Sequence, residues 1–258
     1  MTIEIMLLLF GGGLIAGVIN AVGGGSTFMT FPIFLFAGLP PTVANASNFV
    51  AVMPGNLMAT VAYRATFKEI GRVCIPYLIS CTAGGLIGSL LLLLTNEIVF
   101  RAIIPPLMGF ATITYALGPA VQRWLDRKNI GLFDKDSPLA LLLLFVFSVY
   151  GGYFGAGYGV VLLAVLTVMG HSSYHEANAI KNLVITVVTI LGIGLFTFSA
   201  KISWPEALTM MSGAVIGGYF GVKFALNIPQ PIIRVGIIVL GCSLTFLYRD
   251  LSITRGFP

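Results

Sequence analysis

The sequence predicts an all-α integral membrane protein with about eight transmembrane segments, arranged as two homologous halves of four segments each. Two features of the composition support this fold class. Of the 258 residues, 57% are apolar and only 9% are charged, whereas soluble domains carry about 25% charged residues. The mean hydropathy is +1.00. Apolar runs that can supply the ~20 helical residues needed to cross a bilayer also follow one another along the chain.

The apolar runs are separated by short polar breaks. They lie near residues 5–37, 43–64, 73–95, 98–118, 138–170, 175–199, 204–226 and 230–248. The first and fifth are too long for one straight crossing, and each contains a glycine cluster, within 23–25 and 151–159. Glycine adopts backbone conformations that interrupt a helix, so we predict broken helices in segments 1 and 5. A break in hydrocarbon leaves backbone N–H groups that protein, water or ligand must satisfy. Both breaks are therefore candidate binding sites.

An internal repeat relates the two halves of the chain. The alignment places residues 17–94 over 151–226, 21–25 over 155–159, and 44–50 over 177–183. We therefore predict a first membrane repeat at residues 1–121, a cytoplasmic connector at 122–137 and a second membrane repeat at 138–258.

The distribution of Lys and Arg predicts the orientation, because these residues accumulate on the cytoplasmic side of a membrane. If every segment spans once, most of them fall on the face that holds both termini and the connector. We therefore predict a multi-pass membrane protein with cytoplasmic termini and connector. Segments 1 and 5 as re-entrant hairpins would leave an odd number of crossings in each half and invert the two halves. The cleaner charge separation favours eight spans.

Several function classes are disfavoured by the residues present. All nine carboxylates lie at or near segment ends, whereas proton relays and cation sites use carboxylates inside the membrane. The three cysteines form no CxxC motif, and the sequence contains no phosphate-binding loop and no recognisable pair of nucleophile and base. The net charge of +5 comes from dispersed basic residues. We expect no enzymatic activity, cofactor, metal or nucleic-acid partner.

The polar residues inside the apolar segments favour an anion site instead. An anion that leaves water needs donors, which the N-terminus of a broken helix, hydroxyls, amides and an ammonium can supply. The candidate substrate-binding residues are Asn20, Gly24, Gly25, Ser26, Thr27, Asn45, Ser47 and Asn48 in the first half and Tyr158, Gly159, Asn178, Lys181 and Asn182 in the second. Half-helices that begin near Ser26 and Val160 would direct their N-termini at one cavity, where Lys181 supplies a full positive charge.

Structural roles remain open for these residues. The glycines can serve as packing kinks, and the hydroxyls can bond to carbonyls of their own helix. The amides can tie helices together, and the Lys181 stem can extend to the membrane interface. Small-xxx-small pairs such as Gly84/Gly88 and Gly213/Gly217 allow close helix packing. We expect them to pack the two halves together, with a homodimer as the alternative.

Several motifs carry a resemblance to a known family. They are Gly23-Gly-Gly-Ser26, Gly38-Leu-Pro-Pro41, Val43-Ala-Asn-Ala-Ser-Asn48, Tyr63-Arg64, His175-Glu-Ala-Asn-Ala179 and Ile202-Ser-Trp-Pro-Glu-Ala207. Together they resemble the sulfite exporter TauE/SafE family over nearly the whole chain. The resemblance implies an inner-membrane transporter that exports sulfite, sulfonates or related small anions. Two features depart from the family pattern: the second glycine cluster is less dense, and Lys181 stands where a small hydroxyl residue is usual.

Taken with this resemblance, the sequence leads us to expect a carrier that exports sulfite or an organosulfonate by alternating access at a site between the repeats. Its partners would be a small anionic substrate and the lipid bilayer. The alternatives are an importer of a sulfate-like, thiosulfate-like or carboxylate anion, and a membrane scaffold without transport activity.

Overall fold

The computed structural model describes residues 1–22, 25–128, 137–169, 174–225, 235–243 and 245, and its regular elements there are all helical. The labelled α-helices are α1 (Ile3–Val22), α2 (Thr27–Phe36), α3 (Pro41–Ala62), α4 (Arg64–Ile70), α5 (Ile75–Leu94), α6 (Glu97–Lys128), α7 (Pro138–Tyr153), α8 (Tyr158–Val168), α9 (Tyr174–Phe198) and α10 (Trp204–Ala225), with a 3-10 turn at Gly71–Cys74. Residues 235–243 are helical as well. Within this described part, α1, α5, α6 and α9 are long and apolar enough to cross a membrane. The all-α membrane class is therefore confirmed.

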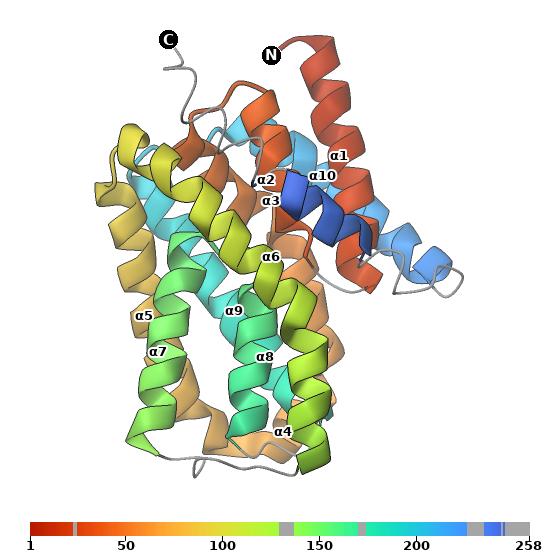
Figure 1. Cartoon of the computed structure of the whole chain (residues 1–258). Coiled ribbons are helices and arrows are strands. Elements are labelled where there is room, and N and C mark those ends of the chain that lie inside the picture. The colour runs from red at the N-terminus through yellow and green to blue at the C-terminus, as the bar shows by residue number, and fades with distance from the viewer. Residues whose placement is uncertain (23–24, 129–136, 170–173, 226–234, 244, 246–258) are drawn as a thin grey trace.

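Segment 1 is broken, as predicted, and the chain reverses at the break. Gly25 has a φ of +88°, a left-handed conformation that glycine adopts without strain. Gly12 of α1 faces Ile33 of α2, and Asn20 at the end of α1 bonds to Ser26 before α2. The contact between the middle of α1 and the second half of α2, together with the bond at the turn, defines an antiparallel hairpin (Figure 1).

Segment 5 is also broken and also reverses. Gly155 and Gly157 have φ values of +79° and +73° between α7 and α8. Tyr158 at the start of α8 bonds to Ser148 late in α7, while residues from early α7 and late α8 line the same cavity. The two helices therefore run antiparallel, side by side (Figure 1).

These reversals correct the predicted topology. The prediction that residues 5–37 and 138–170 each cross the bilayer once is wrong, because each segment turns back at its glycines. The hairpin alternative describes the structure. The N-terminus and the facing ends of α6 and α7 consequently lie at opposite ends of the helix bundle (Figure 1). If the bundle spans the membrane, these two ends face opposite sides, and the side on which each of them lies stays a prediction. Residues 129–136 and the C-terminal residues 246–258 lie outside the described residues.

Two element boundaries differ from the predicted segments. The polar break after the second segment contains the short helix α4, from which Ile70 packs into the core. Helix α6 continues to Lys128, past the predicted end at residue 118 and into the stretch predicted as a connector. Hydropathy marks only the part of a helix that suits lipid, so a polar extension of the same helix goes undetected.

Glycine allows two pairs of parallel helices to pack in close contact. A Cβ on Gly17 of α1 would lie 2.2 Å from the carbonyl oxygen of Ala214 in α10. A Cβ on Gly88 of α5 would lie 2.0 Å from the carbonyl oxygen of Val149 in α7. Each interface joins one helix from the N-terminal part of the chain to one from the C-terminal part. The predicted role of the small-xxx-small pairs in packing within one chain is confirmed.

The central helices α3 and α9 are antiparallel. The rings of Phe49 and Phe196 lie 5.3 Å apart near one end of the interface, and those of Tyr63 and His175 lie 6.4 Å apart at the other. Proline opens α3 at Pro41, where its missing N–H costs no helix bond. These two helices carry most of the candidate polar residues.

Candidate functional site

A group of hydroxyl and amide side chains surrounds the break between α1 and α2. Ser26 Oγ donates to Asn20 Oδ1 at 3.4 Å, and Asn48 Nδ2 donates to Thr27 Oγ1 at 3.4 Å. Thr30 Oγ1 donates to Asn48 Oδ1. These five residues, Asn20, Ser26, Thr27, Thr30 and Asn48, form the first-break cluster. Four of them are predicted site residues, and the structure brings those four together.

The first-break cluster is shielded from solvent. Ser26, Thr30 and Asn48 expose 6%, 1% and 2% of their surface. Helix α2 begins within the cluster, so the positive end of its dipole lies beside these donors. Thr30 is absent from the predicted site, although it lies one helical turn after Ser26 and therefore on the same side of α2.

The two glycine breaks meet the same face of α6. A Cβ on Gly25 would lie 3.0 Å from Cε2 of Tyr115, and a Cβ on Gly157 would lie 3.2 Å from the carbonyl oxygen of Ala111. Ala111 and Tyr115 are one helical turn apart, on one side of α6. The breaks therefore lie at similar depth in the bundle. The predicted site residue Gly24 lies outside the described residues.

Two predicted site residues bond at the second break. Asn45 Nδ2 donates to the Tyr153 carbonyl at 2.8 Å, and the Tyr158 hydroxyl lies 2.6 Å from Ser148 Oγ. Asn45 is fully buried, and its Oδ1 has no hydrogen-bond partner among the residues that the structure describes. Tyr158 is 3% exposed. Asn45 thus ties α3 to the end of α7, and Tyr158 secures the first turn of α8.

Ser47 has a contact of a different kind. Its Oγ accepts the N–H of Ser203 at 3.0 Å, just before α10 begins. The side chain is fully buried. Ser47 therefore joins α3 to the start of α10, away from the hydrogen bonds of the first-break cluster.

Lys181 lies in a second polar group on α9. Its Nζ donates to Asn178 Oδ1 at 2.8 Å, one turn earlier on the same helix. A Cβ on Gly159 would lie 3.8 Å from Cδ of Lys181, so the lysine stem passes beside the first turn of α8. Gly159, Asn178 and Lys181 form the lysine cluster. Asn178 is 5% exposed and Lys181 is half-buried.

A seam of polar contacts joins α3 to α9 between these two groups. Thr60 Oγ1 lies 2.7 Å from Thr186 Oγ1 and 3.0 Å from the Asn182 carbonyl. Thr186 Oγ1 donates to the Asn56 carbonyl at 3.0 Å, and Asn56 Nδ2 donates to Thr189 Oγ1 at 3.4 Å. These five residues form the α3–α9 seam. Of them, only Asn182 is a predicted site residue, and it contributes its backbone carbonyl.

Helix geometry gives the spacing between the groups. Asn48 and Thr60 are twelve residues apart in α3, which corresponds to ~18 Å along the helix axis. Thr60 contacts Asn182, the neighbour of Lys181. The first-break cluster and the lysine cluster therefore lie at different depths. The seam begins beside the first-break cluster, because the Asn20 amide packs against Gly55.

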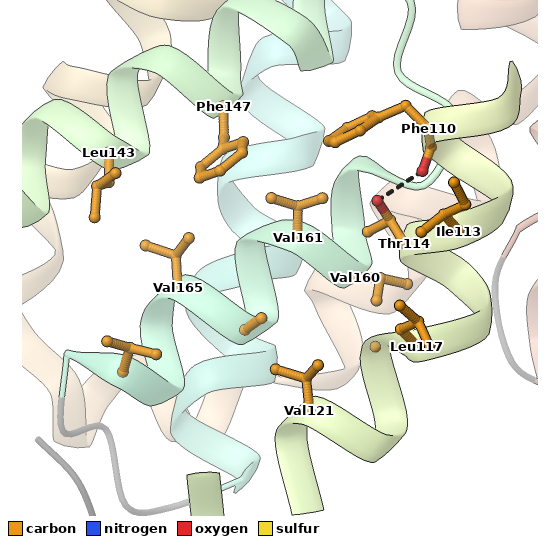
Figure 2. Close-up of a pocket in the computed structure, with 13 residues that line it drawn as sticks. Phe110, Ile113, Thr114, Leu117, Val121, Leu143, Phe147, Val160, Val161 and Val165 are labelled. Atoms are coloured by element: carbon orange, nitrogen blue, oxygen red, sulfur yellow. Dashed lines mark hydrogen bonds between the residues drawn. The ribbon is translucent and has the colours of Figure 1, made fainter. Parts of the chain in front are cut away.

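A cavity of about 400 Å³ lies between α6, α7 and α8 (Figure 2). Its lining includes Ile113, Leu143, Phe147 and Val165, and the hydroxyl of its one threonine, Thr114, bonds to the Phe110 carbonyl of the same helix. This cavity offers an anion almost no donors. Its apolar lining therefore does not suit the predicted anion site.

The chain is similar to a known transporter family and to several curated proteins. Residues 9–248 match the family model described as Sulfite exporter TauE/SafE. A probable membrane transporter protein of Haemophilus influenzae is 25% identical over 249 residues, covering 94% of each chain. The probable membrane transporter protein YfcA of Escherichia coli is 28% identical over 236 residues, covering 90% of this chain and 85% of that protein. No solved structure matches the chain.

The family match extends over nearly the whole polypeptide and includes both helix breaks and both polar groups. It confirms the resemblance seen in the sequence motifs. The chain belongs to the sulfite exporter TauE/SafE family of membrane transporters, and it is not an enzyme.

Proposed function

We propose that this transporter exports a small sulfur-containing anion, sulfite or an organosulfonate, across a bacterial inner membrane. The first-break cluster is the central binding site. The observation that carries the proposal is the burial of Ser26, Thr30 and Asn48 at a helix break that faces the same side of α6 as the second break. Hydroxyls and amides at a helix N-terminus can replace the hydration of an anion.

These hydroxyl and amide groups donate hydrogen bonds without a change of protonation state. They therefore suit a carrier that needs no carboxylate inside the membrane. Export of one negative charge from a cell with an inside-negative potential gains ~2.3 kcal/mol per 100 mV. This energy can drive export without a coupling ion. It also predicts a transport rate that depends on membrane potential.

Alternating access would use two inverted repeats, residues 1–121 and 138–258, on either side of the connector. Three packing relationships support this organisation. The α1–α10 interface has its counterpart in the α5–α7 interface, since both are parallel and glycine-lined. The hairpin α1–α2 has its counterpart in α7–α8, and α3 lies antiparallel to α9. Inverted repeats with a site at broken helices are a common plan for carriers.

Loop charge supports a cytoplasmic location for the connector end of the bundle. Arg64 and Arg123 are exposed there, and basic residues accumulate on the cytoplasmic side. The N-terminus would then face the periplasm. The export direction runs from the lysine cluster toward the first-break cluster and onward.

The test is flux of sulfite and of an organosulfonate in proteoliposomes with an imposed potential. Wild-type protein should move at least one of these anions, faster when the potential expels negative charge. Vesicles that move neither anion at any potential would overturn the proposal. Uptake of sulfate, thiosulfate or a carboxylate in the same assay would favour the importer alternative.

A further inference from the structure

Lys181 is a half-buried cation that lacks a charged partner in the described part of the chain. Its hydrogen bond goes to the neutral Asn178 amide oxygen, and no carboxylate among the described residues forms a salt bridge with it. A charge withdrawn from water without a counter-charge is costly. An anion that binds beside the ammonium would remove much of that cost.

The lysine stem is held in the bundle instead of extending freely into solvent. It passes Gly159 in the first turn of α8, where an added Cβ would lie 3.8 Å from the lysine Cδ. Asn178 holds the ammonium at 2.8 Å. Two neighbours therefore fix the direction of the side chain, so that the cation is placed before any ligand arrives.

The lysine cluster and the first-break cluster cannot bind one small anion together. The helix rise between Asn48 and Thr60 alone is ~18 Å, several times the diameter of a sulfite ion. The α3–α9 seam fills the space between them, and its Thr60 and Thr186 hydroxyls are in direct contact at 2.7 Å. A passage between the two groups along the interface of α3 and α9 would have to cross this contact.

We infer that Lys181 and Asn178 form a second anion subsite at the connector end of the bundle, separate from the first-break cluster. It takes a small oxyanion such as sulfite before the anion crosses the seam. This inference rests on the proposed function. A lysine ammonium is a compact point charge without the bidentate fork of arginine, which suits an anion that has to leave again.

Equilibrium binding of radiolabelled sulfite to the purified, detergent-solubilised protein tests the inference directly. Wild-type protein should saturate at two sulfite ions per chain, Lys181→Met at one and Lys181→Arg at two. Lys201→Met removes a lysine that lies just beyond the other end of α9, and this variant should still bind two ions. Asn48→Asp should also saturate at one ion, because it alters only the first-break cluster. Wild-type saturation at one ion, or two ions on Lys181→Met, would overturn the inference.

Flux separates the inference from the proposed function. In oriented vesicles, Lys181→Met should raise the KM for sulfite supplied from the connector end by about tenfold, the equivalent of ~1.4 kcal/mol. The KM from the other end should stay within twofold. Binding of two ions without any flux would refute the proposed function and retain the second subsite. Flux by a protein that binds only one sulfite ion would support the proposed function and refute the second subsite.

Discussion

The Thr60 and Thr186 hydroxyls lie 2.7 Å apart across the interface of α3 and α9. Each also reaches a backbone carbonyl on the opposite helix, at Asn182 and Asn56 respectively. The pair therefore joins the two central helices by reciprocal side-chain bonds in place of apolar packing. Such hydroxyl bonds can be exchanged for bonds with water, which suits the separation of these helices in the proposed alternating-access mechanism.

Thr60→Val should lower the free energy of unfolding by about 1 kcal/mol, because valine keeps the shape of threonine but donates no hydrogen bond. Thermal unfolding in detergent measures the effect. Thr114→Val is the matched control, because that hydroxyl bonds only within its own helix, and its effect should be smaller. In the double variant with Thr186→Val, the two effects should be less than additive. Fully additive effects would show that the hydroxyls are not coupled.

Asn48→Asp should reduce sulfite flux at least tenfold, since it places a carboxylate of the same shape in the first-break cluster, where it repels an anion. The control is Asn96→Asp. Asn96 Oδ1 accepts the Val99 N–H at the start of α6, and aspartate fills this capping role equally well. Flux of the Asn96 variant should remain normal. Unchanged flux in Asn48→Asp would remove the cluster from the transport path.

Gly88→Ala should destabilise the protein by about 1–3 kcal/mol, because the added methyl meets the Val149 carbonyl oxygen at 2.0 Å and forces α5 from α7. Gly11→Ala is the control, since a Cβ added there would have nothing within 4 Å. It should stabilise α1 slightly through helix propensity. The yield of folded protein and the unfolding midpoint distinguish the two variants, and equal midpoints would contradict the close approach of α5 and α7.

Gly25→Ala should impair both stability and transport. Its φ of +88° strains any side chain by roughly 1–2 kcal/mol, and its Cβ would press on Tyr115. Gly38→Ala isolates the strain, because Gly38 has a φ of +91° and open space around it. Both variants should lose stability, but only Gly25→Ala should lose flux at matched amounts of folded protein. Equal flux in the two variants would show that transport does not depend on the conformation of the first break.

A single cysteine at Thr2 should be labelled from the opposite side of the membrane to one at Arg123. The reason is that the N-terminus and the end of α6 lie at opposite ends of the bundle (Figure 1). A membrane-impermeant maleimide applied to intact cells, on a background without the three native cysteines, measures accessibility. Labelling of both positions from one side would contradict the hairpin arrangement of α1 and α2.

The helical class and the positions of both breaks follow from the sequence, but the direction of the chain after each break does not. Glycine clusters and apolar composition identify where a helix ends. A long apolar run has the same hydropathy whether it crosses once or turns back, because hydropathy carries no direction. The distribution of Lys and Arg then favoured a single crossing by each long segment, whereas both segments turn back. The contacts of Gly12 with Ile33 and of Asn20 with Ser26 decide the direction.

The candidate site was predictable to a similar extent. Asn20, Ser26, Thr27 and Asn48 share hydrogen bonds, since α2 directly follows the break and a short turn joins α2 to α3. The depth of Lys181 relative to Asn48 depends on how α9 packs against α3. That packing involves residues far apart in the chain, and the spacing of residues within one helix does not predict it.

The glycine-lined contact of α1 with α10 also constrains how the protein is made. About two hundred residues separate Gly17 from Ala214, so the ribosome releases the first helix long before its partner exists. Contacts of such long sequence separation form slowly, and nascent α1 has to wait in the membrane or associate with something else. Biogenesis of this chain should therefore depend on whatever shelters α1 until translation is nearly complete.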